Sequence, residues 1–284
     1  MFTYPDDIYE KLEFDKVLSK IAVYCYGAPA KSLILGMRPF DNRRKIERML
    51  DEIQEFQKSM DLGYEFPLSF YESIDEELKL LAKIDYVLDV EQYISIYVHM
   101  RMIREIELFF EPAERKAELP LLYLISNQIT IDPQILDSFQ AVFSDDGKIR
   151  MDASPDLERI FKLIISKERE LNKAFARSIE KYRKLGYLTD NLESVKNSRR
   201  VLSVNAENKR KIKGVIHDES STGKTVFIEP EEILEINNEL FELEADKRQE
   251  IYRILKALSA QLRPYIDDFA LWQKILVRYD VIRA

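Results

Sequence analysis

The sequence predicts a mainly α-helical protein: a helical core, and a long antiparallel helix pair that ends in a small antiparallel β tip. Three observations predict this class. The 284 residues include only 7 glycines and 10 prolines, which leaves few tight turns and favours long helices. Two segments, 154–185 and 230–263, carry apolar residues at helical spacing over many turns. Between them lie short β-branched runs separated by turn-forming residues.

The segment 1–153 is predicted to be the helical core. Apolar residues recur at helical spacing over about 7–26, 42–61, 74–84, 90–110, 119–127 and 133–143. Pro39 and Asp41 separate the first two helices, and Leu62–Ser73 is expected to be a loop. Asp145-Asp146-Gly147 predicts a turn, followed by a short strand at Ile149.

The segment 154–190 is predicted to be the first long helix. Ser154 and Pro155 are the residue types preferred at the N-cap and at the first helical position. Residues then alternate at spacings of four and three, the heptad pattern of a coiled coil: Leu157, Phe161, Ile164, Glu168, Leu171, Phe175, Ser178, Tyr182 and Leu185. Gly186 is expected to end the helix, whose 32 residues would measure roughly 48 Å at ~1.5 Å per residue.

The segment 191–229 is predicted to be the β tip. Strands are expected at Val201–Val204, Val215–Ile216 and Thr225–Ile228, and turns at Asn205–Asn208 and Asp218–Gly223. The segment 230–263 is the second long helix. It is opened by Pro230 and carries an apolar face up to Pro264: Ile233, Ile236, Leu240, Leu243, Lys247, Ile251, Ile254 and Leu258. Residues 264–284 are expected to return to the core as a helix.

Positive charge is concentrated in the predicted tip. Between Lys196 and Lys213 there are seven Lys and Arg and one acidic residue, Glu207, although the whole chain carries a net charge of −8. Such a patch predicts a polyanionic partner, and without a recognition helix it predicts contact with a nucleic-acid backbone rather than with bases. The alternative is a solvated surface with a chance excess of charge. The candidate contacts are Lys196, Arg199, Arg200, Lys209, Arg210, Lys211, Lys213 and Lys224.

Other motifs predict no chemistry in this chain. Ser221–Thr225 resembles the end of a phosphate-binding P-loop, but Asp218 stands where the first glycine belongs and a strand follows, so a hairpin turn is predicted. His99 and His217 lack partners at metal-ligand spacing. Ser220 and Ser221 have no candidate general base apart from His217, and no constellation typical of a catalytic nucleophile is present in the sequence. We therefore predict no metal, no cofactor and no enzymatic activity for the chain itself.

The sequence also indicates in which cellular compartment the chain is expected. Cys25 is a single cysteine, so no intramolecular disulfide can form, and a buried, inert thiol in a cytoplasmic protein is expected. The N-terminus lacks the pattern of a signal peptide, and no apolar run approaches the ~20 residues that span a bilayer.

Several sequence blocks resemble the MutS family. The run Gly214–Leu243, GVIHDESSTGKTVFIEPEEILEINNELFEL, resembles the clamp motif of the second MutS subfamily, which lacks the mismatch-recognition domain. The matching positions are His217, Asp218, Ser220, Thr222, Gly223, Thr225, Phe227, Ile228, Glu229, Pro230, Asn237, Asn238 and Leu240. Blocks at Leu12–Leu18, Met37–Pro39, Asp145–Ile160 and Arg278–Ala284 resemble the same subfamily in the same order. The strand entering the clamp departs from the pattern, because Arg200–Asn205 lacks the family's proline and lysine.

The resemblance implies a fold and a function. The two long helices would be a lever, the β tip a clamp, and a family ATPase domain, with ATP, Mg²⁺ and a homodimer interface, should begin just after Ala284. The chain would then be the lever and clamp region of a DNA-binding ATPase. It would grip double-stranded or branched DNA through backbone contacts, in DNA repair or recombination control. Two alternatives stay open: the clamp of a factor acting on stalled or collided ribosomes, and a coiled-coil module that binds a protein.

Overall fold

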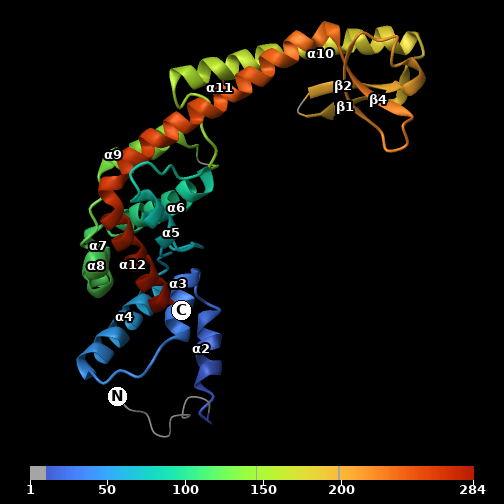
Figure 1. Ribbon diagram of the computed structural model, residues 1–284. Helices are drawn as coiled ribbons and strands as arrows, with labels where there is room; N and C mark the ends of the chain where they lie inside the picture. Colours follow the sequence, from blue (N-terminus) through green and yellow to red (C-terminus); the bar gives the residue numbers. More distant parts are fainter. Residues whose placement is uncertain (1–10, 145, 198) are drawn as a thin grey trace. The chain divides into compact units, whose positions relative to one another are not determined.

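A computed structural model of the chain describes residues 11–144, 146–197 and 199–284 (Figure 1). Residues 7–10 of the first predicted helix and Asp145 of the predicted turn lie outside the described residues. The chain divides into two compact units. We call Met1–Ile149 with Leu255–Ala284 the core unit, and Arg150–Ile254 the arm unit. None of the helices in the described ranges is both long and apolar enough to cross a membrane.

Helices make up the core unit, as predicted. They are α2 (Phe14–Ala22), α3 (Ala28–Leu35), α4 (Arg43–Asp61), α5 (Asp75–Leu81), α6 (Val90–Phe109), α7 (Ala113–Glu118), α8 (Pro120–Ser126), α9 (Pro133–Val142) and α12 (Ile266–Arg283). The helices expected at 42–61, 74–84, 90–110, 119–127 and 133–143 are confirmed with small shifts at their ends. Ile149 forms a single β-bridge with Phe143.

The expected helix over 7–26 is wrong at its C-terminal end. Helix α2 stops at Ala22, and a second helix, α3, starts after Gly27. The reason is a tertiary contact: the buried carboxylate of Asp280 on α12 accepts hydrogen bonds from the backbone N–H groups of Tyr26 (3.0 Å) and Gly27 (2.8 Å). These donors at the start of α3 would otherwise lack partners. Sequence spacing alone carries no sign of a partner more than 250 residues away.

The core unit is organised around α12. Its residues Phe269, Trp272 and Tyr279 are among the least exposed aromatic side chains, and the helix packs against α3, α4, α5 and α6. The Tyr279 hydroxyl donates to the carbonyl of Leu122 on α8 (2.7 Å), so burial does not leave it unpaired. Cys25 is buried as predicted, and burial raises the pKa of its thiol.

Two long helices dominate the arm unit, although the last residues of the second, from Leu255 onward, belong to the core unit. Helix α10 (Pro155–Lys184) begins as predicted, because the Ser154 hydroxyl accepts a hydrogen bond from the Leu157 N–H (3.1 Å). It ends before Gly186, whose positive φ of 71° is the left-handed conformation that glycine tolerates. Helix α11 (Glu231–Leu262) begins one residue after Pro230, which is the last residue of strand β4 rather than the first of the helix.

Helices α10 and α11 run antiparallel. Lys181 pairs with Glu232 (2.6 Å) near one end, and Ser154 donates to Glu250 (2.5 Å) near the other. The predicted seam is buried at six of its nine positions and half-buried at Phe161. Glu168 and Leu185 are exposed instead, and Ile160 and Ala174 are buried beside the seam. A straight helix of 3.6 residues per turn drifts from a strict heptad in this way.

The middle of this helix pair is thinly packed. Helix α10 has no fully buried residue between Ile164 and Leu171, and α11 has none between Asn237 and Glu250, all of them described residues. An ion pair between Lys167 and Glu239 (2.5 Å) joins the helices there. We call this section the waist of the pair.

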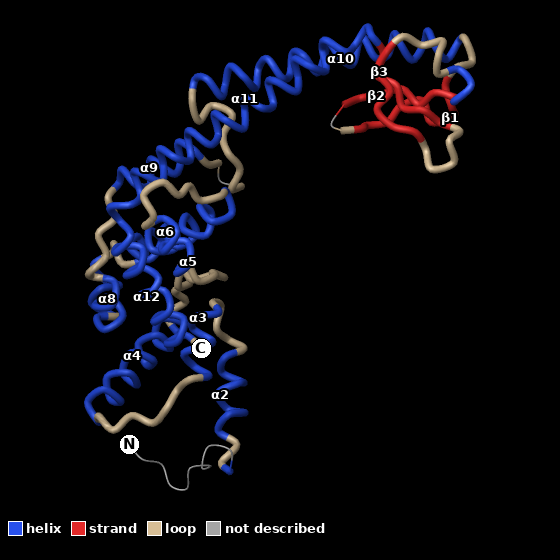
Figure 2. The backbone as a smooth tube through the Cα atoms, viewed as in Figure 1, coloured by secondary structure: helices blue, strands red, loops and turns tan. Residues whose placement is uncertain are grey.

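A four-stranded antiparallel sheet, formed by described residues, connects α10 to α11 (Figure 2). Its strands are β1 (Leu188–Lys196), β2 (Arg199–Asn205), β3 (Gly214–Glu219) and β4 (Thr225–Pro230), in the order β1-β2-β4-β3. The three predicted strands are confirmed and β1 was not predicted. The turn expected at Asp218–Gly223 is wrong at its start, because Asp218 and Glu219 continue β3 in register with Phe227 and Val226.

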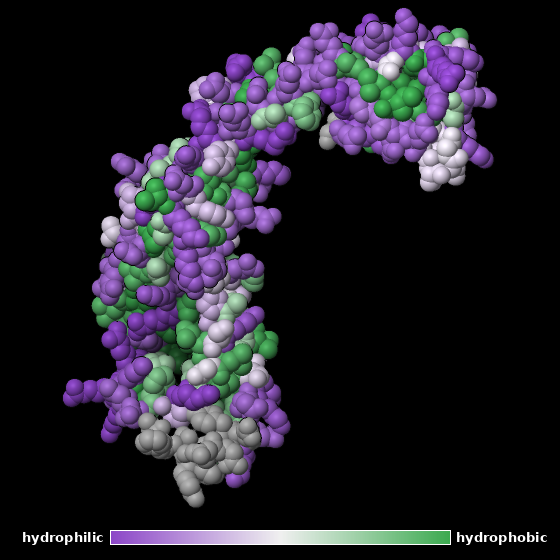
Figure 3. Space-filling view, viewed as in Figure 1, coloured by the Kyte–Doolittle hydropathy of each residue, from purple (hydrophilic) through white to green (hydrophobic). Residues whose placement is uncertain are grey.

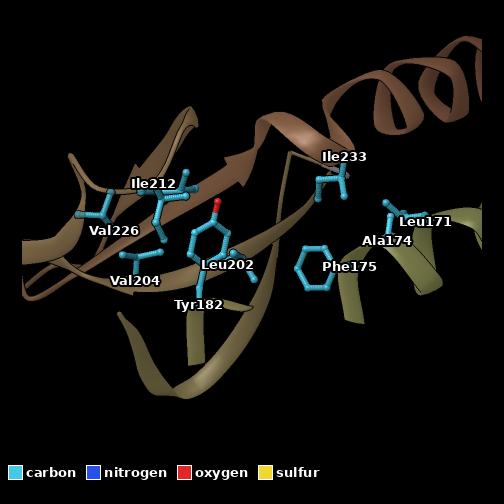
Figure 4. Packing of buried hydrophobic residues seen from close by; sticks show 10 residues of the cluster. Leu171, Ala174, Phe175, Tyr182, Leu202, Val204, Ile212, Val226 and Ile233 are labelled. Atoms are coloured by element: carbon cyan, nitrogen blue, oxygen red, sulfur yellow. The ribbon is translucent and has the colours of Figure 1, made fainter. Parts of the chain in front are cut away.

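One face of the sheet packs on the helix ends. Leu202, Val204, Val226 and Ile228 alternate along β2 and β4 and form a cluster with Phe175 of α10 and other buried residues (Figure 4). This alternation is the period of two that places every second side chain on the same face. Most of the visible surface of the arm unit is hydrophilic (Figure 3). The apolar residues of this face thus anchor the sheet to the helices.

Candidate nucleic-acid interface

The basic residues singled out in the sequence all lie on the sheet and its connections. Lys196 ends β1, and Arg199 and Arg200 begin β2. Residues 206–213 cross from β2 to β3, starting with a single 3₁₀ turn (Ala206–Asn208), and we call them the crossover. The crossover carries Lys209, Arg210, Lys211 and Lys213, and Lys224 lies in the turn between β3 and β4.

Four of the eight positive side chains are paired with carboxylates. The ion pairs are Lys196 with Asp218 (2.7 Å), Arg199 with Glu229 (3.0 Å), Arg200 with Glu193 (2.7 Å) and Lys209 with Glu219 (3.1 Å). The ammonium group of Lys196 lowers the pKa of the Asp218 carboxyl. Each ion pair neutralises one positive charge that the sequence analysis had counted as free to contact a nucleic-acid phosphate.

The other four have no carboxylate partner among the described residues. Lys211 donates to the amide oxygen of Asn208 (2.9 Å) and lies 5.1 Å from the centre of the Tyr187 ring, which leaves its charge uncompensated. Arg210, Lys213 and Lys224 are exposed, with no hydrogen-bond or ion-pair partner for their side chains in the described chain. These four residues, which we call the open cations, retain a full charge toward solvent.

The backbone fixes where the open cations stand. The Ala206 N–H donates to the Lys224 carbonyl (3.0 Å), and the Glu231 N–H donates to the Lys213 carbonyl (3.0 Å). Between these two points Ile212 is buried in the sheet cluster. The crossover is therefore held at both ends by backbone hydrogen bonds and between them by the buried Ile212. Its positive side chains extend from a fixed backbone.

One buried carboxylate, to which the sequence patterns assigned no role of its own, organises the part of the β tip that adjoins α11. Glu229 is 1% exposed and accepts hydrogen bonds from Arg199 (3.0 Å), His217 (2.6 Å) and the amide of Asn237 (2.7 Å). Arg199 also donates to Asn238 (2.7 Å). We call this group the Glu229 cluster. A buried charge needs such partners to be tolerated.

The Glu229 cluster explains what several motif positions do. Glu229, Asn237 and Asn238 were recognised only as part of a resemblance, and His217 was also considered as a metal ligand and as a base. In the structure these residues join β3, β4 and the first turns of α11. Arg199, predicted as a phosphate contact, is the fifth member. The sequence signal for this cluster was a glutamate directly after a predicted strand, Glu229, with two asparagines eight and nine residues after it.

Gly214 allows β3 to approach β4 closely at the same place. A Cβ atom on Gly214 would lie 2.1 Å from the carbonyl oxygen of Glu229, which is a backbone atom. Any other residue would therefore push the two strands apart. The glycine keeps Glu229 within reach of β3.

The segment that resembles a P-loop is a hairpin turn, as predicted. The Ser220 N–H donates to the Thr225 carbonyl (2.8 Å), and Gly223 has a positive φ of 66°. Strand β4 follows directly, and α11 begins only at Glu231. The residues present do not fit a nucleotide phosphate site, which needs a helix N-terminus behind the loop.

Three further features of the described chain lie away from the tip. No group of three or more His, Cys, Asp and Glu side chains within the described ranges is placed to hold a metal ion. His99 is buried in the core unit, and burial lowers its pKa. A cavity of about 1080 Å³ in the core unit is lined mainly by apolar side chains of α3, α4 and α12, including Leu33, Leu50 and Val277.

Comparison with known proteins points to one group of relatives. The chain is 29% identical over 279 residues to Endonuclease MutS2 of Lacticaseibacillus paracasei. It is 30% identical over 277 residues to Endonuclease MutS2 of Lactococcus lactis subsp. lactis, and 31% over 277 residues to that of Streptococcus pyogenes serotype M18. Each match covers 98% of this chain, which spans 35% of the length of these relatives. No family model matches the chain.

Proposed function

We propose that this chain is the lever and clamp region of a protein of the second MutS subfamily, and that its tip grips double-stranded or branched DNA by the backbone. The relatives named Endonuclease MutS2 match almost the whole chain and support a MutS-related, DNA-associated function. Nuclease activity, ATP and Mg²⁺ binding and homodimer formation are assigned to a full-length protein and not to these residues.

The observation that carries the proposal is the set of open cations on the tip. Strands β1–β4 with their connections, residues 188–230, hold eight Lys and Arg against six Asp and Glu, a net charge of +2 on a chain of −8. Because the acidic partners pair with four of the eight, the surplus is concentrated on Arg210, Lys211, Lys213 and Lys224. Flexible lysine and arginine side chains on a fixed backbone suit phosphate contacts, which carry no sequence information.

The lever part of the proposal rests on the antiparallel contacts between α10 and α11. Two helices joined near both ends transmit a displacement along their length better than a single helix would. The Glu229 cluster and the shared apolar cluster attach the sheet to these helices. A force on the tip would therefore reach α10 and α11 directly.

The test is the salt dependence of binding to duplex DNA, measured by fluorescence anisotropy between 50 and 200 mM salt. Four phosphate contacts predict a slope of log affinity against log salt of roughly −3.6, which corresponds to about a 150-fold loss over this range. All eight predicted contacts would give a slope about twice as steep. A flat dependence would refute the backbone clamp.

A charge-matched comparison locates the interface. The triple variant Arg210→Glu, Lys213→Glu, Lys224→Glu is expected to abolish binding. The control triple variant Arg159→Glu, Lys173→Glu, Arg248→Glu changes three exposed positive residues of α10 and α11 by the same total charge. Equal weakening by both variants would mean that net charge, and not the tip, governs binding.

The alternatives from the sequence are separated by the choice of ligand. Four-way junction DNA, duplex DNA, structured RNA and ribosomes are compared under the same conditions. Preference for ribosomes would favour the ribosome-associated role. Binding to a protein partner that survives reversal of the open cations would favour the coiled-coil interaction module.

A further inference from the structure

The sheet has a second face, opposite the apolar cluster, that the backbone clamp does not use. Ser203 of β2, Phe227 of β4 and Asp218 of β3 stand in one row across the sheet, because Ser203 pairs with Phe227 and Asp218 pairs with Phe227. Phe227 is half-buried. Its position alternates with Val226 and Ile228, which face the helices.

Lys196 covers the ring of Phe227. Its ammonium nitrogen lies 4.4 Å from the ring centre and 2.7 Å from Asp218. Since Lys196 is on β1 and the strand order is β1-β2-β4-β3, this side chain crosses the sheet to reach them. The side chains of Lys196 and Asp218 are 31% and 48% exposed, so the cover is a solvent-accessible ion pair and not packed core.

Beside the ring lies a buried hydroxyl without a partner. Ser203 is 1% exposed, and its Oγ makes no hydrogen bond to any described group. Buried polar atoms are almost always paired, so an unpaired one beside a covered aromatic ring calls for an explanation. A ligand with hydrogen-bonding atoms at the edge of a flat ring would supply the missing partner.

The energetic balance favours exchange of the cover for a base. An exposed ion pair changes an equilibrium by less than about fivefold. Stacking of one nucleobase on an aromatic side chain increases affinity by about fivefold to a hundredfold. A phosphate close by would also take the place of Asp218 as the partner of Lys196. Opening the cover also removes the contact of the Lys196 ammonium with the Phe227 ring, which changes an equilibrium by about twofold to fivefold. The phosphate replaces the lost ion pair, and the stacked base replaces the lost contact with the ring.

We propose that this face binds one unpaired nucleobase: Lys196 swings to a phosphate, the base stacks on Phe227, and Ser203 hydrogen-bonds to the edge of the base. The proposal rests on the proposed nucleic-acid clamp and deepens it, because it makes nucleic acid with an unpaired base the preferred ligand. Any base can stack, so the preference is for an unpaired base and not for a sequence.

The test compares a 20-base-pair duplex with the same duplex carrying one extrahelical 2-aminopurine, using the whole chain. Tighter binding of the bulged duplex, by about tenfold, is expected, with quenching of 2-aminopurine fluorescence on stacking. Phe227→Leu should remove the preference and the quenching and leave duplex binding unchanged. Phe227→Tyr should retain both. Phe241→Leu, at an exposed phenylalanine of α11, is the matched control and should behave as the unaltered chain.

Ser203→Ala separates a binding role from a structural one. Because the hydroxyl has no partner within the described chain, its removal should not lower the thermal midpoint, yet it should reduce the preference for the bulged duplex about threefold to tenfold. Equal affinity of the unaltered chain for both duplexes, or an unchanged preference in Phe227→Leu, would overturn this inference and leave the backbone clamp standing. Absence of binding to both duplexes at low salt would overturn the clamp as well.

Discussion

Removal of the Glu229 carboxylate is expected to loosen the tip by about 3 kcal/mol. In Glu229→Ala, Arg199, His217 and Asn237 lose their shared acceptor. Breaking a buried charge pair costs about 3–5 kcal/mol. Arg199 and His217 remain 21% and 15% exposed, so water replaces part of what they lose, and the lower end of the range applies.

Hydrogen exchange read by mass spectrometry measures this effect locally. An opening free energy lowered by about 3 kcal/mol accelerates exchange about a hundredfold, and peptides from β2, β4 and the start of α11 should show it. Trp272 lies in the core unit, so its fluorescence on urea denaturation should report an unchanged midpoint.

The control is Glu235→Ala, an exposed glutamate of α11 with no partner for its side chain in the described chain. It should leave exchange within a factor of about three, as surface substitutions do. Less than a tenfold acceleration in Glu229→Ala would refute the view that this carboxylate holds β3 and β4 to α11.

Three further predictions concern packing, backbone and pH. Phe175→Ala should lower the unfolding free energy of the arm unit by about 3–5 kcal/mol, measured by urea denaturation followed by circular dichroism, because it empties a fully buried site in the sheet cluster. Gly214→Ala should cost about 1–3 kcal/mol in the same assay, since the new methyl group meets backbone atoms. Acidification below pH 6.5 should destabilise the core unit, because the buried His99 of the folded chain resists protonation and the unfolded chain then binds more protons. Trp272 fluorescence in urea should show a loss of up to about 1.4 kcal/mol per pH unit, and His99→Gln should flatten it.

Elements fixed by local chemistry were predictable from the sequence. Ser154 and Pro155 mark the start of α10 to the residue, and Gly186 marks its end, because a cap and a left-handed glycine act within one turn. The strands β2 and β4 were visible as short apolar runs between turn formers. In these places the nearest neighbours in sequence decide the structure.

Elements fixed by distant partners were not predictable. Strand β1 reads LTDNLESVK, a polar sequence with little strand preference, and it becomes a strand by pairing with β2 around a bulge. The start of α3 depends on Asp280. The pairing of charges was not predictable for the same reason, since Glu193, Asp218 and Glu219 meet their basic partners only in the folded sheet and its connections.

The waist of the helix pair gives it uneven elasticity. Two rods bonded firmly along their length bend as one thick beam, whereas rods free to slide past each other bend as two thin ones. Around Lys167 and Glu239 the link is an ion pair with side chains 27% and 40% exposed. Dissolved ions screen the attraction between solvent-accessible charges, with a screening length of about 8 Å at physiological ionic strength that shortens as salt is added. Raising the salt concentration should therefore soften the middle of the beam more than the end near Lys181 and Glu232, where buried apolar side chains such as Phe175 and Ile233 join the helices in addition to an ion pair.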